Sequence, residues 1–298
     1  MGPDVRDKFL KFKETDYSLS TPGVARFRVN AYTQRGSTAG AFRIIPEKVP
    51  SIDELKLPQI CHTFATLQQG FILVTGPTGQ GKSSTLAAII EEININRAEH
   101  IVTIEDPVEF VYQNKKSIIS QRELGGDTKS FGRALKSVLR QDPNVVMVGE
   151  MRDPETMKLA LTTAETGHLV FATLHTNSAS QTIDRIVDSF PEDQQDQIKT
   201  QLANALEAVF SQRLVPSKDG KRVVASEVMV ASPAVRSNIR EGKVHQIDNI
   251  IQTSAELGMM LLETSLANLI NRGLIDKDVA YRYSNHPTVL AKLVGDVK

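Results

Sequence analysis

The chain of 298 residues is 40% hydrophobic and 23% charged, values of a globular protein with one large domain or two smaller ones. Its 35 basic and 35 acidic residues balance, so net charge indicates no nucleic-acid or membrane-surface partner, and its single cysteine excludes a disulfide framework or a multi-cysteine zinc site within the chain. Because no apolar run approaches ~18 residues and the start lacks the apolar core of a signal peptide, we expect a cytoplasmic protein without a transmembrane segment.

The first 46 residues contain two strand-like runs, at 25–32 and 40–45, which carry Arg28 and Arg43. Two strands and a turn bury little on their own, so residues 1–46 are expected to lean on the rest of the chain or to be the remnant of a larger N-terminal domain. Three prolines follow between residues 46 and 58, and they predict an interdomain linker at 47–58 with a short helical piece.

From residue 59 onward, apolar strand-like runs alternate with helical patterns. The predicted strands lie at 71–75, 101–105, 145–148 and 169–174, and the predicted helices at 84–95, 130–140 and 154–166. This alternation predicts an α/β core with a parallel sheet. Beyond residue 178 the pattern is mostly helical, apart from a strand-like run at 222–230. We therefore expect one large domain over 59–298 that ends in a helical region from about residue 231.

A glycine-rich loop stands between the first of these strands and the first of these helices. Residues 76–83 match the phosphate-binding pattern G-x-x-x-x-G-K-[ST] at every constrained position. Glycines let the backbone approach the phosphates, Lys82 would reach the β- and γ-phosphates, and the Ser83 hydroxyl would ligate Mg²⁺. The sequence therefore predicts nucleotide binding, with Gly76, Pro77, Thr78, Gly79, Gln80, Gly81, Lys82, Ser83 and Ser84 as the contact residues.

Acidic residues and histidines follow the other predicted strands. Glu105 and Glu109 are at or just after the end of the strand at 101–105, and Glu150 follows the strand at 145–148. Because ligands of open α/β sheets bind at the carboxyl ends of strands, these acids are expected near the triphosphate, with Glu150 in the place of a Mg²⁺-supporting acid. The residues alone do not decide between Glu105 and Glu109. His168 and His175 flank the strand at 169–174, where a structural histidine is the alternative to a functional one.

The order of these motifs resembles the secretion ATPase superfamily, the hexameric motors of type II secretion and type IV pili. Four segments carry the resemblance, at 76–83, 103–109, 139–153 and 163–176, and it extends from about residue 26 to at least residue 260. Assembly and type II secretion members usually have a four-cysteine zinc module, which one cysteine cannot build. Residues 234–241 also resemble the signature of pilus-retraction members, because Arg236, Arg240 and Glu241 are kept although four other positions differ.

The resemblance implies a RecA-like P-loop ATPase core, a partial PAS-like N-terminal domain at 1–46, and ATP and Mg²⁺ as cofactors. It also implies roles for single residues. Glu109 matches the general base for the attacking water, Glu150 the acid that supports Mg²⁺, and His175 the sensor of the γ-phosphate, with His168 as the earlier histidine of the same motif. Arg28 and Arg43 match arginines that complete a site across a subunit boundary.

The function implied by this resemblance is a homo-hexameric ATPase that powers type IV pilus retraction. Such a motor would lie peripheral to the inner membrane at the pilus base and contact a membrane platform protein. The alternatives are a pilus-assembly or type II secretion ATPase of the same superfamily, a RecA-like nucleic-acid translocase, and a nucleotide-binding regulator without turnover. The single cysteine argues against an assembly or type II secretion ATPase. The zero net charge argues against a nucleic-acid translocase, and the intact set of Lys82, Glu109 and Glu150 argues against a regulator without turnover.

Overall fold

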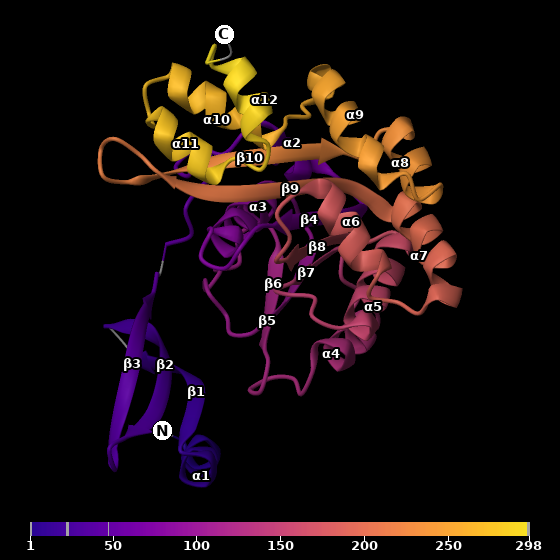
Figure 1. Ribbon diagram of the computed structural model, residues 1–298. Coiled ribbons are helices and arrows are strands. Elements are labelled where there is room, and N and C mark those ends of the chain that lie inside the picture. The colour runs from indigo at the N-terminus through magenta and orange to yellow at the C-terminus, as the bar shows by residue number, and fades with distance from the viewer. Residues whose placement is uncertain (1, 22–23, 47, 297–298) are drawn as a thin grey trace.

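The computed structural model describes residues 2–21, 24–46 and 48–296. At the N-terminus, α1 (Pro3–Phe12) precedes a three-stranded antiparallel sheet, which consists of β1 (Glu14–Thr21), β2 (Ala25–Gln34) and β3 (Ser37–Ile45) in that order (Figure 1). Arg28 pairs with Arg43 across β2 and β3, while the next residue on β2, Val29, is fully buried. Sequence patterns predicted β2 and β3 but not α1 or β1, because β1 is largely exposed and α1 buries none of its residues.

A seven-stranded sheet forms the core, with the strand order β10-β9-β4-β8-β7-β5-β6. Its strands are β4 (Gly70–Thr75), β5 (His100–Glu105), β6 (Ile118–Glu123), β7 (Val145–Val148), β8 (Leu169–Leu174), β9 (Leu206–Pro216) and β10 (Arg222–Val230). Neighbouring strands are parallel except for β9 and β10, which are antiparallel. The predicted α/β core with a parallel sheet is therefore confirmed.

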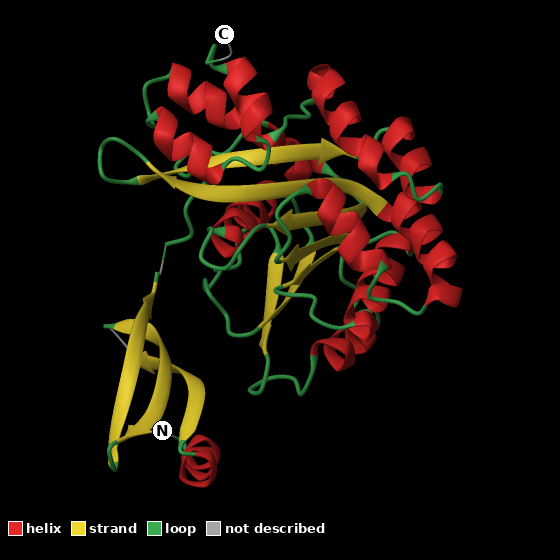
Figure 2. Ribbon diagram, in the orientation of Figure 1, coloured by secondary structure: helices red, strands yellow, loops and turns green. Residues whose placement is uncertain are grey.

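Helices cover both faces of this sheet (Figure 2). One face packs against α2 (Ile60–Thr66) and α3 (Lys82–Asn96), and the other packs against α4 (Phe131–Val138), α5 (Pro154–Glu165), α6 (Ala179–Val187) and α7 (Glu192–Ala205). Alternate residues of β4 enter the two layers, since Phe71 belongs to the second layer and Ile72 to the first. Burial on both faces explains why the strands are continuous apolar runs. The N-cap of α5 is Asp153, whose carboxylate accepts the N–H of Thr156 at 2.8 Å.

Two core strands were not expected from the sequence. β9 lies in the segment beyond residue 178 that was predicted to be mostly helical, and its first residues, 206–208 (Leu-Glu-Ala), directly follow α7 and do have high helix propensity. Pairing with β4 on one side and β10 on the other overrides that propensity, because it buries most of β9 in the sheet. β6 is an edge strand with no fully buried residue, so it lacks the apolar run that marks the central strands.

The C-terminal part adds helices that pack beside β9 and β10. They are α8 (Pro233–Arg240), α9 (Ile247–Thr253), α10 (Leu262–Asn271), α11 (Lys277–Tyr283) and α12 (Pro287–Leu293), with short 3₁₀ turns at Val244–Gln246 and Ala255–Leu257. Leu262 and Leu266 of α10 form a separate apolar cluster with Val215 of β9 and Ala225 of β10. Among the described residues, no helix has both the length and the apolar character that crossing a membrane requires.

The linker that precedes α2, over the described residues 48–58, contains turns and no helix. Leu55 donates its N–H to the carbonyl of Ser51 at 3.1 Å and Lys56 to that of Asp53 at 3.0 Å, while Ile52 is fully buried against the core. The short helical piece that was expected between residues 47 and 58 is therefore a series of turns over the described residues 48–58. Residue 47 lies outside the described part of the chain.

Candidate functional site

The glycine-rich loop begins at the carboxyl end of β4, an interior strand of the sheet, and leads into α3. Gly76, Gly79 and Gly81 have φ values of 140°, 77° and 84°, a region that favours glycine. At Gly76 the restriction is also steric, because a Cβ atom there would lie 2.4 Å from the carbonyl oxygen of Gln212. Pro77 and Thr78 form the outer part of the loop, where Thr78 is exposed. The loop is thus shaped by its glycines and by the adjacent strand β9.

Lys82 lies under this loop, at the first residue of α3. Its Nζ atom donates to the carbonyls of Gly76 at 2.6 Å and Pro77 at 3.0 Å, and only 8% of the residue is exposed. Burial lowers the pKa of Lys82, while the charge of Glu150 opposes that change. The lysine is therefore held by the loop in the place from which it can meet a bound phosphate.

A buried glutamine of β9, which the sequence did not indicate, fixes the second half of the loop. Gln212 donates to the carbonyl of Gln80 at 2.6 Å and accepts the hydroxyl of Thr85 at 2.7 Å. Gln80 in turn accepts the N–H of Leu214 at 2.6 Å. These contacts join the loop and the start of α3 to β9. A residue that acts through such long-range contacts leaves no local motif in the sequence.

Beside the loop is a cavity of about 310 Å³. Apolar side chains from the linker turns and from β9 and β10 form its walls, with polar groups of α3 at one end. Its lining residues are Leu55, Leu57, Gly81, Ser84, Thr85, Gln212, Leu214, Arg222 and Val224. The cavity therefore borders the predicted contact residues Gly81 and Ser84.

The ends of β7 and β8 bring Glu150 and His175 to the loop. His175 Nε2 lies 2.9 Å from a carboxylate oxygen of Glu150, and its Nδ1 lies 3.2 Å from Lys82 Nζ and 3.5 Å from the Thr78 hydroxyl. These partners imply that Nε2 carries the proton and Nδ1 accepts. Burial alone would raise the pKa of Glu150, but hydrogen bonds and charges from Arg152 and His175 lower it below its usual value. Glu150 is thus an ionised acid next to the loop.

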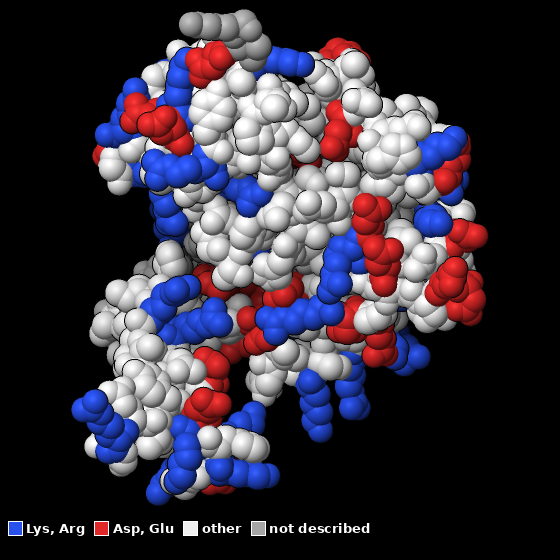
Figure 3. All heavy atoms as spheres, viewed as in Figure 1, with Lys and Arg blue, Asp and Glu red and all other residues white. Residues whose placement is uncertain are grey.

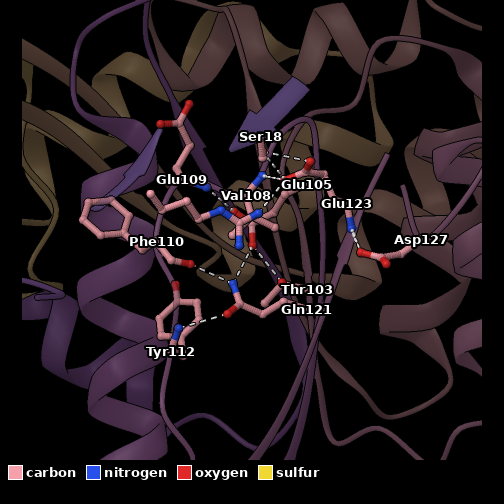
Figure 4. Close-up of polar contacts among 11 residues, drawn as sticks. Ser18, Thr103, Glu105, Val108, Glu109, Phe110, Tyr112, Gln121, Glu123 and Asp127 are labelled. Atoms are coloured by element: carbon pink, nitrogen blue, oxygen red, sulfur yellow. Dashed lines mark hydrogen bonds and ion pairs between the residues drawn. The ribbon is translucent and has the colours of Figure 1, made fainter. Parts of the chain in front are cut away.

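Glu105 and Glu109, which the sequence did not distinguish, have different surroundings. Glu105 is 6% exposed, and its carboxylate accepts the Thr103 hydroxyl at 2.8 Å and the N–H of Glu109 at 3.2 Å. Burial raises its pKa, against the effect of these hydrogen bonds. The side chain of Glu109 points away from this network (Figure 4) and is 34% exposed. Glu105 is therefore enclosed by its hydrogen-bond partners, whereas the carboxylate of Glu109 is partly open to solvent.

The N-terminal sheet meets the core on the side of Glu109. Arg28 Nη1 lies 3.3 Å from a carboxylate oxygen of Glu109, so this arginine contacts the acid of its own chain. Figure 3 shows basic and acidic side chains facing one another where the two units meet. The side chain of Arg43 is exposed on the neighbouring strand and makes no hydrogen bond or ion pair with another described residue.

The other two predicted residues, Ser83 and His168, lie at opposite ends of the sheet's strands. Ser83 is exposed in the first turn of α3, next to Lys82. His168 precedes β8, at the opposite end from His175, and its Nδ1 lies 3.0 Å from the carbonyl of Thr163. His168 therefore contacts the end of α5 and lies at the opposite end of β8 from the phosphate-binding loop. In the described part of the chain, no group of three or more His, Cys, Asp or Glu residues is placed to hold a metal ion.

A mainly parallel sheet with a glycine-rich loop after the interior strand β4, a lysine under the loop and acids at nearby strand ends defines a P-loop nucleotide-binding protein. The chain belongs to the type II/IV secretion system protein family, whose family model matches residues 50–273. The match covers the linker turns, the whole core sheet and the first C-terminal helices.

Several proteins are similar to this chain over nearly its entire length. The twitching motility protein of Neisseria gonorrhoeae is 53% identical over 283 residues, 95% of this chain and 76% of that protein. The type IV pilus retraction ATPase PilT of Pseudomonas aeruginosa is 48% identical over 287 residues, 96% of this chain and 83% of that protein. A crystal structure of the pilus retraction motor PilT with bound ADP is similar with a TM-score of 0.93 and 46% identity, over 98% of this chain and 83% of that one. The likeness thus includes the N-terminal sheet.

Proposed function

We propose that this chain is an ATPase motor that powers type IV pilus retraction. The observation that carries the proposal is the contact of Lys82 with His175, and of His175 with Glu150, at a phosphate-binding loop. Motion driven by hydrolysis requires groups on separate strands that respond to the same phosphate. The two contacts link the loop after β4, which holds Lys82, to the ends of β8 and β7, which carry His175 and Glu150. The retraction ATPase and twitching motility relatives, which are similar over 95% or more of the chain, support pilus retraction as the process.

ATP would bind with its phosphates along residues 76–84 and with Mg²⁺ beside them. Lys82 and the loop N–H groups would face the β- and γ-phosphates, and the exposed Ser83 hydroxyl would ligate the metal. Glu150, as an ionised acid, would support the hydrated Mg²⁺. A Mg²⁺ ion usually takes one or two protein oxygens and completes its shell with water and phosphate, so the absence of a metal-binding cluster in the described residues fits this arrangement.

The cavity beside the loop is the proposed site of the adenine ring. Leu55, Leu57, Leu214 and Val224 offer the apolar walls that a flat heteroaromatic base prefers, and Ser84 lies between this cavity and the phosphate positions. Because two of these walls come from the linker turns, a bound base would also fix the segment that leads to the N-terminal sheet.

Glu109 is the proposed general base for the attacking water. It lies beyond the strand end and carries a partly exposed carboxylate, while Glu105 is buried and holds the N–H of Glu109. His175 exchanges its contact with Lys82 for one with the γ-phosphate and so reports the nucleotide state to the end of β8. Arg28 and Arg43 stabilise the charge that develops on the phosphate in the transition state.

We further propose that six chains form a ring in which these arginines complete the site of a neighbouring chain. The ring would lie at the cytoplasmic side of the pilus base and pass its motion to a membrane platform protein. In the isolated chain Arg28 is beside its own Glu109. Subunit mixing can distinguish an arginine that acts within its own chain from one that acts on the neighbouring chain. Lys82→Ala chains mixed with Arg28→Ala chains should regain activity if the arginine acts across the boundary, whereas a mixture that stays inactive would contradict the shared site.

The direct test of the proposed chemistry is steady-state hydrolysis by a Glu109→Gln variant. It should bind ATP with an affinity close to wild type and lower turnover by about 100-fold or more, because the shape of the side chain is kept and the base is lost. Glu256→Gln, at an exposed glutamate of the 3₁₀ turn Ala255–Leu257, is the matched control and should turn over normally. Wild-type turnover in Glu109→Gln would refute the base assignment.

A further inference from the structure

The segment that carries Glu109 is held in an unusual way. It follows β5 and runs over residues 107–112, and among the described residues no backbone–backbone hydrogen bond involves any of these positions. Side chains satisfy its backbone groups instead. The N–H groups of Val108, Glu109 and Tyr112 and the carbonyl of Phe110 all bond to side chains of β5 or β6. The place of Glu109 therefore depends on a few side chains rather than on a regular ladder.

Gln121 of β6 makes most of these contacts at one end of the segment. Its amide oxygen accepts the N–H of Tyr112 at 2.9 Å, and its amide nitrogen donates to the carbonyl of Phe110 at 2.8 Å. The same nitrogen lies 3.3 Å from the carboxylate of Glu105, which accepts the N–H of Glu109. One amide thus braces the segment at Phe110 and at Tyr112, just after Glu109 (Figure 4).

Glu123, two residues further along β6, holds the other end. Its carboxylate accepts the N–H of Val108 at 3.1 Å. The same carboxylate accepts the Ser18 hydroxyl at 2.9 Å and the guanidinium of Arg26 at 3.0 Å, both from the N-terminal sheet. Glu123 is 18% exposed, so these contacts are partly screened from water. The carboxylate of Glu123 is therefore shared between the segment that carries Glu109 and the N-terminal sheet.

We propose that Gln121 and Glu123 are positioning residues for hydrolysis, and that Glu123 makes the position of Glu109 depend on the docking of the N-terminal sheet. This inference rests on the proposed role of Glu109 as the base. A base must lie within hydrogen-bond reach of the attacking water, so a loosened segment lowers the rate without removing a catalytic group. When the sheet leaves, Glu123 loses two of its partners and the N–H of Val108 is held less firmly.

The first test is Gln121→Leu in the full chain, with Gln252→Leu on the exposed face of α9 as the matched control. Backbone amide exchange of a peptide covering 106–113, measured by mass spectrometry, should become at least about tenfold faster, because three hydrogen bonds of the amide are lost. Turnover should fall between about 10- and 100-fold, while the affinity for ADP changes by less than about twofold. Unchanged exchange, or faster exchange with normal turnover, would overturn the positioning role.

The second test removes the contact from the side of the N-terminal sheet. Ser18→Ala should speed exchange of the same peptide and lower turnover, whereas Ser20→Ala, at an exposed serine on the same face of β1 with no polar partner among the described residues, should do neither. Equal behaviour of the two variants would overturn the dependence on docking. Glu109→Gln is measured in parallel. If it turns over normally, the base assignment fails, while the exchange and turnover of the Gln121 variant still decide the positioning role.

Discussion

The buried acid Glu227 should make the stability of this protein depend on pH in a direction opposite to that of most acids. Glu227 lies on β10, is 4% exposed and accepts the N–H of Ala179, the first residue of α6, at 2.7 Å. Burial raises its pKa to about 7, and the charges of Asp248 and Glu263 add to the effect. The folded chain therefore binds a proton here that the unfolded chain has already released at neutral pH.

The magnitude follows from the difference between a pKa of about 7 and the ordinary value of 4.5. It corresponds to at most about 3 kcal/mol of the free energy of unfolding. Because the folded pKa of Glu227 is the higher one, the stability that it contributes is complete below pH 4.5 and is lost as the pH rises through 7. A Glu227→Gln substitution removes this titration, so the stability of the variant relative to wild type should rise by up to about 3 kcal/mol across that range.

Urea denaturation at pH 5 and pH 8 measures the stability of Glu227→Gln relative to wild type. Both proteins are kept at the same ionic strength and at a concentration where light scattering shows monomers. Glu256→Gln is the control, since its carboxylate is exposed and its stability relative to wild type should not change with pH. The reasoning would be refuted if wild type and Glu227→Gln differed by the same free energy at both pH values. A relative stability of the variant that falls with rising pH would refute it as well.

Three further predictions concern the nucleotide site and its surroundings. Gly76→Ala should abolish nucleotide binding in a fluorescent-ADP titration, because its Cβ would clash with the carbonyl of Gln212, and a wild-type affinity would contradict the loop geometry. Lys82→Ala should keep the wild-type circular dichroism spectrum and lose about 100-fold or more in turnover, so normal turnover of the folded variant would exclude the P-loop role. Cys61 is buried with a pKa raised to about 12, so a thiol reagent should label it only in denaturant, and rapid labelling of the native protein would show that the α2 layer is open.

Much of the core could be predicted because its strands are buried on both faces. The runs at 145–148 and 169–174 correspond to the bounds of β7 and β8. The phosphate loop and its flanking strand and helix were equally clear, since the loop chemistry restricts residue types at fixed spacing. β6 and β9 were missed for physical reasons. An edge strand needs no apolar run, and the helix propensity of 206–208 is overridden only by pairing with β4 and β10.

The site could be predicted only in part. Glu150 and His175 could be proposed because they follow apolar strands, and the structure places His175 against Lys82 and Glu150 against His175. Gln212 and Gln121 were not found, because a glutamine that braces a distant loop has no local signal. The sequence also could not separate Glu105 from Glu109, since the two differ by burial and partners rather than by residue type.

The central claim, that hydrolysis by this chain powers pilus retraction, is tested most directly by counting surface pili in a strain that lacks its gene. Without retraction, filaments are built but not removed, so the strain should carry more pili than wild type. A plasmid with the wild-type gene should restore the normal number, and one with Lys82→Ala should not, because the phosphate contact is lost. A strain without pili would instead identify an assembly motor, and normal pilus numbers would contradict a role in the pilus cycle.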